Sequence, residues 1–336
     1  MHTTMSALAL VLTLGQQPAS PEEAKVAEEI VMLGGRIGID ETIPGSPIVQ
    51  LNMVGADTKN AGDKWLSRLG CLSELRRASF SGCPISDPGL KHLLQFKKLT
   101  ELHLRACPVS DAGMKHIGAL AGLTVLDLAG TRVTDDGVED LGKLTQLKSL
   151  DISKTRVTGL GLGKLPNVKK LTVLDVGFSP VTDAGLKQIC SHNHLRELSI
   201  GGTKITDAGL RHLTDLAELE QLILGYVFPS DGSTTQEPFT DAGMAHVGKL
   251  KTLRYLSLSG SKVTDDGVAR LAGLNELRTL SLEGTSVSDG SIETLGKLTN
   301  LAVLRLWDTK ISKEGLRKIR SELSKTKVTV LPGGKG

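Results

Sequence analysis

The chain has 336 residues, of which 39% are hydrophobic and 3% aromatic, and its formal net charge at pH 7 is +3. So small a charge gives no reason to expect a nucleic acid or a membrane surface as a partner attracted by bulk electrostatics. No run of residues approaches the roughly 18 consecutive apolar residues that a membrane span requires.

Residues 1–20 differ in composition from the rest of the chain. An apolar stretch from Met5 to Gly15 is followed by small and polar residues up to Ser20, the order of a signal peptide and its cleavage zone. No Lys or Arg precedes the apolar stretch, which leaves a disordered N-terminus as the alternative. We therefore predict a signal peptide over 1–20 and a secreted or periplasmic protein, with a cytoplasmic location as the alternative.

Residues 21–48 have the pattern of a cap. An amphipathic helix is expected from Pro21 to the glycine pair Gly34–Gly35. Two strands, 36–40 and 48–53, follow it and are joined by a turn that contains Pro and Gly. Stacked repeats need such a device at their ends, so this segment is expected to cover the first repeat.

From residue 49 to 331 the chain repeats the 24-residue pattern L-x-x-L-x-L-x-x-[T/C/S]-x-[V/I]-[T/S]-D-x-G-L. Within one copy, Leu123, Leu126 and Leu128 have the spacing of an extended segment, whereas Val138 and Leu141 have helical spacing. One unit is therefore strand, turn and helix. No copy can bury its apolar faces alone, so neighbouring copies must stack into a solenoid.

This pattern resembles the leucine-rich repeat family, in the variant with Thr, Cys or Ser where others carry Asn. The TDxGL repeats are similar to those of bacterial, planctomycete-type members and of the repeat regions of F-box proteins. The resemblance covers about residues 49–331. It implies an α/β leucine-rich repeat solenoid, a curved right-handed horseshoe with a parallel inner sheet and outer helices. We expect one domain of about twelve rungs and a flexible tail over 332–336.

Two departures from the period are visible. The interval between Leu51 and Ala78 is 27 residues, which predicts a longer helical side in the first repeat, where Asp63 replaces an apolar residue. The interval between Leu222 and Leu256 is 34 residues and predicts an insertion loop at 226–239. Insertions in a solenoid often lie on the binding side. The aromatic residues expected to contact a partner there are Tyr226, Phe228 and Phe239.

Several repeated polar residues have structural interpretations. The Asp column, which includes Asp111 and Asp135, precedes the helical pattern, where carboxylates satisfy free N–H groups. The Gly two positions later is expected to allow close packing between neighbouring turns. Cys83 and Cys107 share the Thr position, so a disulfide is conceivable, but free buried thiols are favoured.

The segment Cys190-Ser-His192-Asn-His194 suggested zinc, although four ligands are not visible. A partly buried His192 with a backbone partner is the favoured interpretation. No catalytic signature occurs, so we predict no enzyme, no cofactor and no metal site.

The residues that alternate with the buried leucines must face the exposed side of the sheet. Asp127, Asp151 and Asp175 would place like charges about 5 Å apart there, which a cation or a basic partner must compensate unless solvated Asp is tolerated. His103 lies on the rung before them. Toward the C-terminus the same face carries Tyr255, Arg305 and Trp307, and aromatic and Arg side chains are frequent at the energetic centres of interfaces.

These observations predict a monomeric, non-enzymatic scaffold that recognises a protein or peptide through the concave face and the 226–239 loop. Two alternatives stay open. One is a metal- or small-ligand-binding, or hydrolytic, protein that uses His103 and the Asp row. The other is a substrate-recognition subunit by analogy with F-box proteins, although no F-box precedes the repeats.

Overall fold

The computed structural model describes residues 20–330 except 57, 166–167 and 226–238. The predicted signal peptide, the C-terminal tail and most of the insertion loop lie outside the described residues. The chain divides into two compact units: unit 1 comprises residues 1–156 and 164–170, and unit 2 comprises residues 157–163 and 171–336. The prediction of one repeat domain over 49–331 stays a prediction.

Unit 1 begins with helix α2 (Pro21–Met32) and continues as short strands that alternate with short helical segments. Its strands are β1 (Arg36–Ile39), β2 (Ile48–Asn52), β3 (Arg77–Ser79), β4 (Glu101–His103), β5 (Val125–Asp127) and β6 (Ser149–Asp151). Its other helices are α3 (Asp63–Leu66), α4 (Asp111–Gly118), α5 (Asp135–Glu139) and the 3-10 turns η1 (Thr58–Asn60), η2 (Leu69–Cys71), η3 (Leu90–Gln95) and η4 (Asp140–Lys143).

Unit 2 repeats the same alternation. Its strands are β7 (Val173–Asp175), β8 (Glu197–Ser199), β9 (Gln221–Gly225), β10 (Tyr255–Leu258), β11 (Thr279–Ser281), β12 (Val303–Arg305) and β13 (Lys327–Thr329). Its helices are α6 (Asp183–Ile189), α7 (Asp241–Val247), α8 (Asp265–Ala269), α9 (Ile292–Lys297), α10 (Lys313–Glu322), η6 (Gly209–Asp215) and η7 (Asp289–Ser291). The 3-10 turn η5 (Gly161–Lys164) contains residues of both units.

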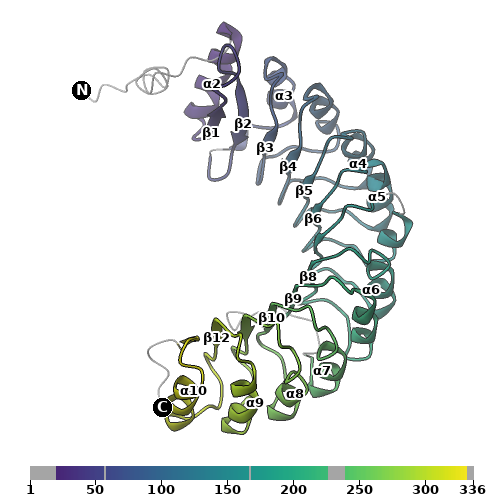
Figure 1. Cartoon of the computed structure of the whole chain (residues 1–336). Helices are drawn as coiled ribbons and strands as arrows, with labels where there is room; N and C mark the ends of the chain where they lie inside the picture. Colours follow the sequence, from purple (N-terminus) through teal and green to yellow (C-terminus); the bar gives the residue numbers. More distant parts are fainter. Residues whose placement is uncertain (1–19, 57, 166–167, 226–238, 331–336) are drawn as a thin grey trace, which may run out of the picture. The chain divides into compact units, whose positions relative to one another are not determined.

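The central leucines of the pattern are aligned across the strands of each unit. β1 and β2 are the two predicted strands and pair antiparallel, and β2 to β6 then pair in parallel, as do β7 to β13. Leu102 lies opposite Leu126, and Leu256 lies opposite Leu280. All four are 1% exposed or less. The predicted repeat solenoid of strands and helices is thus confirmed (Figure 1).

Within each unit the described helices cover one face of the sheet, and none of them lies on the other face, here called the open face (Figure 1). Aliphatic side chains between sheet and helices form the core, in layers such as Leu126, Leu128, Val133, Val138 and Leu141. Full burial of one such side chain contributes about 1.5–3 kcal/mol. None of the described helices has the length and apolar character needed to cross a membrane.

The Asp column links each repeat to the next. Asp111 Oδ1 accepts from the backbone N–H of Thr134 at 2.8 Å, and its Oδ2 accepts from the Thr134 hydroxyl at 2.7 Å. The Thr134 hydroxyl in turn accepts from Asp136 N at the start of α5. The Thr134 hydroxyl supplies the helix cap, whereas the Asp111 carboxylate bonds to the following repeat, so the prediction that the Asp caps its own helix was wrong. The other described pairs of this kind are Asp63–Ser86, Asp87–Ser110, Asp183–Thr206, Asp207–Thr240, Asp241–Thr264, Asp265–Ser288 and Asp289–Ser312.

The repeated glycine makes room for this carboxylate. A Cβ on Gly137 would lie 2.3 Å from Asp111 Oδ1, and one on Gly209 would lie 2.1 Å from Asp183 Oδ1. Both distances are far below van der Waals contact. The predicted close packing at this position is confirmed, and it outweighs the cost of about 1 kcal/mol that glycine brings to a helix.

The first repeat differs from the prediction. Asp63 does not replace an apolar residue: its carboxylate accepts from Ser86 N at 2.8 Å, so it begins the Asp column. The interval from Asp63 to β3 equals the interval from Asp87 to β4, and the three additional residues therefore lie between β2 and Asp63. They belong to the turn that contains η1, and the prediction of a longer helical side was wrong.

Candidate functional site

The open face of unit 1 is built from three rows of side chains. The strand register places Asn52, Ser79, His103, Asp127 and Asp151 in one row. Because side chains alternate along a strand, the residues two positions before and after these lie on the same face. Because neighbouring strands pair in the same register, the surface of this face varies only through the side chains at these positions.

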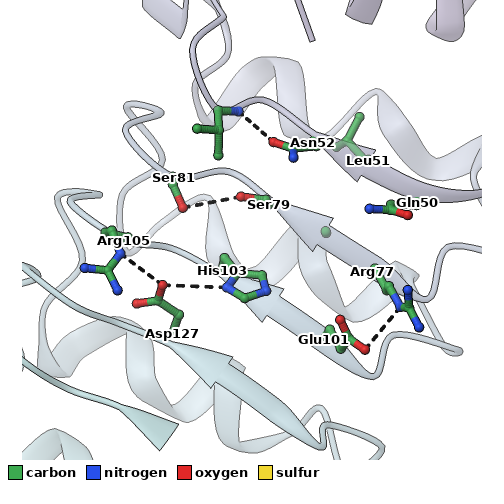
Figure 2. A pocket seen from close by; sticks show the side chains of 12 residues that line it. Gln50, Leu51, Asn52, Arg77, Ser79, Ser81, Glu101, His103, Arg105 and Asp127 are labelled. Atoms are coloured by element: carbon green, nitrogen blue, oxygen red, sulfur yellow. Dashed lines mark hydrogen bonds and ion pairs between the residues drawn. The ribbon is translucent and has the colours of Figure 1, made fainter. Parts of the chain in front are cut away.

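A depression of about 460 Å³ lies over β3 on this face (Figure 2). Ser79 and Ser81 are short, whereas the residues beside them on the adjoining strands are long. The lining consists of Gln50, Leu51, Asn52, Val54, Arg77, Ala78, Ser79, Ser81, Glu101, His103, Arg105 and Asp127. The depression therefore results from two serines set between larger side chains.

Arg105 resolves the expected repulsion between Asp127 and Asp151. Its Nε donates to Asp127 Oδ2 at 3.1 Å and its Nη2 donates to Asp151 Oδ2 at 2.5 Å. The other oxygen of each carboxylate accepts a backbone N–H two residues later, from Ala129 and Ser153, both at 2.9 Å. The compensating cation thus belongs to the chain itself, and the alternatives of a bound cation, a basic partner or a merely tolerated row are corrected for this pair.

The ionisation of this group follows from its contacts. Burial raises the pKa of Asp127, but the hydrogen bonds from His103 and the Ala129 N–H and the charge of Arg105 outweigh it, so the pKa lies below its ordinary value of 3.8. For Arg105, burial lowers the pKa while Asp127 and Asp151 raise it, and the two carboxylates prevail. Asp127 and Arg105 are therefore both charged at neutral pH.

His103 lies beside Asp127 but does not complete a hydrolytic site. Its Nδ1 is 3.6 Å from Asp127 Oδ2, and Ser79 occupies the same row on the adjacent strand. The Ser79 hydroxyl lies 3.3 Å from the Ser81 hydroxyl and points away from the imidazole (Figure 2). No cluster of three or more His, Cys, Asp or Glu residues in the described part of the chain could hold a metal ion. The geometry thus offers no support for the hydrolytic or metal-binding alternative.

Asp175, the third Asp of the predicted row, lies in unit 2. Its Oδ1 accepts from Gly177 N at 2.8 Å, the same local contact that Asp127 makes. The rest of the open face of unit 2 carries mostly short side chains. Ser259 accepts from Ser257 at 3.2 Å and lies 2.9 Å from Ser281, which donates to Glu283 at 3.2 Å. These hydroxyls satisfy one another.

The predicted aromatic and basic residues of unit 2 are divided between surface and core. Tyr255 on β10, Arg305 on β12 and Trp307 two residues later are half-buried, so part of each side chain meets solvent. Phe239 is 2% exposed and packs in the core, which corrects its assignment to a contact surface. Tyr226 and Phe228 lie outside the described residues.

Sequence reasoning missed Phe178. This half-buried residue follows β7 with φ +60°, at the turn position where most other repeats have a glycine with positive φ. Left-handed backbone is costly for a bulky side chain. The Phe178 ring lies against Gly202, where a Cβ would come within 2.6 Å of the ring. A comparison of the turn residues down the repeats would have revealed the substitution.

The remaining candidate groups have structural roles. Cys71, Cys83, Cys107 and Cys190 are free thiols, and burial raises the pKa of Cys83, Cys107 and Cys190 to about 12. A disulfide between Cys83 and Cys107 is therefore not formed. His192 Nε2 lies 2.9 Å from the carbonyl oxygen of Leu162, which confirms the predicted backbone partner.

Comparison with known proteins gave two kinds of match. A family model described as Leucine Rich repeat matches residues 97–118, 123–142, 169–190, 191–214 and 249–272. The solved structure of an internalin from Listeria monocytogenes is 23% identical, covers 80% of this chain and 77% of that chain, and has a TM-score of 0.58. No curated protein matched the chain.

Two further solved structures are similar at lower TM-scores. Internalin C2 from Listeria monocytogenes is 26% identical over 64% of this chain and 84% of that chain, with a TM-score of 0.49. A repeat protein from Leptospira interrogans is 18% identical over 78% of this chain and 74% of that chain, with a TM-score of 0.47.

Proposed function

Since the chain is a leucine-rich repeat protein, we propose that it is a non-enzymatic recognition scaffold that binds a protein or peptide through the open face of its sheet. Stacked repeats of this kind present extended binding surfaces. The central leucines, the Asp column and the helices hold the stack together on the other side of the sheet, and the open face adds exposed ion pairs such as those of Arg105. The side chains of the open face are therefore available for contact with a partner.

One observation carries this proposal. Among the aromatic residues that the structure describes, Trp65, Phe80, Phe96 and Phe239 are 3% exposed or less. The remaining ones, Phe178, Tyr255 and Trp307, are half-buried, and all of them lie in unit 2 on the strands or on the turns that follow them. Partly exposed aromatic side chains supply large contact areas in interfaces. At Phe178 the ring is kept despite an unfavourable backbone conformation.

The test uses the full chain and a random peptide library displayed on phage. We expect peptides to be enriched on the wild-type protein, and the double variant Tyr255→Ala/Trp307→Ala to lose most of them. Leu160→Ala is the matched control, because Leu160 is an apolar side chain of unit 2, 50% exposed, that precedes the helical turn η5 instead of lying on the sheet. No enrichment above a bare surface, or equal loss in the control, would contradict the proposal.

Export is a further part of the proposal and rests on the sequence of residues 1–20 alone. N-terminal sequencing of the protein from its native source tests it: a mature chain that begins near residue 20 is expected. A chain that begins at Met1 would assign the protein to the cytoplasm.

A further inference from the structure

We propose that the depression over β3 in unit 1 receives the side-chain carboxylate of an aspartate or glutamate of the partner. This inference rests on the proposed function and adds the chemistry of one contact. It follows from counting the hydrogen-bond donors and acceptors around the depression.

The carboxylates near the depression already have partners within the chain. Glu101 Oε1 forms an ion pair with Arg77 Nε at 3.1 Å. Asp127 accepts from the backbone N–H of Ala129 through Oδ1 and from Arg105 Nε through Oδ2. The negative charges at this site are therefore matched by arginines, and a partner's cation would have to displace one of them.

Several donors around the depression have no acceptor in the described structure. Asn52 Oδ1 accepts from Val54 N at 2.8 Å, which leaves the Asn52 Nδ2 group as a donor. The Ser79 and Ser81 hydroxyl oxygens lie 3.3 Å apart, and one hydroxyl donates to the other. The hydrogen of the accepting hydroxyl is therefore available to a ligand. Arg77 uses Nε for Glu101 and retains its two terminal nitrogens. The site thus offers N–H and O–H groups from Asn52, Arg77 and the two serines that have no acceptor within the described structure.

The charges are layered in depth. The acidic side chains are the less exposed ones, at 12% for Asp127 and 30% for Glu101. The basic side chains lie above them, at 47% for Arg105 and 59% for Arg77. An approaching group therefore meets the guanidinium groups first. Carboxylates form strong, often bidentate, hydrogen bonds with guanidinium groups.

An apolar contact completes the site. Val54 lines the depression and is 59% exposed, so it can pack against the methylene groups of an acidic side chain. The volume of about 460 Å³ exceeds that of one side chain, which leaves space for the backbone that carries it. The occupant that fits is an acidic residue within a longer segment of the partner.

The experiment uses the same displayed library, in which fusion to the coat protein blocks the C-terminus, so that only side-chain carboxylates can be selected. We expect the enriched peptides that the Tyr255→Ala/Trp307→Ala variant still binds to contain Asp or Glu. The synthetic peptides should bind Arg77→Gln about tenfold more weakly, the size of one charge-assisted hydrogen bond, and Ser81→Ala more weakly by a smaller factor. Replacing the acidic residue of the peptide by its amide should weaken binding to the wild-type protein equally.

Arg132→Gln is the matched control, because Arg132 is an exposed arginine of unit 1 outside the depression. Circular dichroism verifies that each variant is folded. If the peptides that the Tyr255→Ala/Trp307→Ala variant still binds lack Asp and Glu, are rich in Lys or Arg, or bind Arg77→Gln and wild type with equal affinity, this inference is overturned while recognition itself stands. No enrichment at all would instead contradict the proposed function.

Discussion

The open faces of the two units have the same arrangement of parallel strands and differ in the chemistry of their side chains. In unit 1 the face carries Arg77, Glu101, His103, Arg105 and Asp127, and ion pairs across strands join Arg77 to Glu101 and Arg105 to Asp127. In unit 2 half of the corresponding positions on β8 to β11 are serine or glycine, and the half-buried Tyr255 occupies another. The difference shows that these positions accept different side chains, because the same register of buried leucines aligns the strands in both units.

The largest effect is expected where the units are alike. Leu126→Ala in unit 1 and Leu256→Ala in unit 2 should each lower the free energy of unfolding by about 2–5 kcal/mol, because each removes a fully buried side chain and leaves a cavity. Urea unfolding measures both. A small loss in one unit and a large loss in the other would mean that the two stacks are not equivalent.

A smaller loss is expected at the links between repeats. Asp111→Ala in unit 1 and Asp241→Ala in unit 2 leave the backbone N–H and the hydroxyl of Thr134 and Thr264 without their acceptor. Each should cost about 1–3 kcal/mol in urea unfolding. The control Asp111→Asn keeps one acceptor oxygen in place and should cost less. Equal losses in Asp111→Ala and Asp111→Asn would assign the effect to charge instead of the hydrogen bond.

The smallest effect on the free energy of unfolding is expected for two arginines of the open face, and it should differ between the units. Arg105→Gln removes the cation between Asp127 and Asp151 and should cost about 1 kcal/mol or less at low salt, since the Arg105 side chain is 47% exposed and solvent screens the pair. Arg305→Gln in unit 2 should cost nothing measurable, because no ion pair of Arg305 is among those of the described residues. Chemical denaturation at low and high salt tests both variants.

The pH dependence of Arg105→Gln has a defined sign. The folded-state pKa of Asp127 lies below 3.8, so its contribution to stability is present above that pH and is lost as pH falls through the lower folded value. Without Arg105 the folded pKa moves up, and less stability remains to be lost in acid. The stability difference between wild type and Arg105→Gln should therefore shrink below pH 4. A constant difference down to pH 2 would contradict the assigned ion pair.

Much of the molecule could be predicted from the chain alone. The 24-residue period indicated which leucines are buried, the glycine beside the Asp column indicated close packing, and the position of His192 indicated a backbone partner. These predictions succeeded because each depends on the spacing of residues within one repeat or on their recurrence in the next. A periodic stack converts such spacing directly into neighbours in space.

Other features were decided only by the tertiary structure. Whether Arg105 reaches both Asp127 and Asp151, whether Phe239 turns into the core, and on which side of Asp63 the additional residues lie all depend on side-chain length and direction across neighbouring strands. The depression over β3 likewise requires two short serines beside longer residues one strand away. A repeat pattern states which positions are equivalent, but contacts between unequal side chains at equivalent positions are settled by packing in three dimensions.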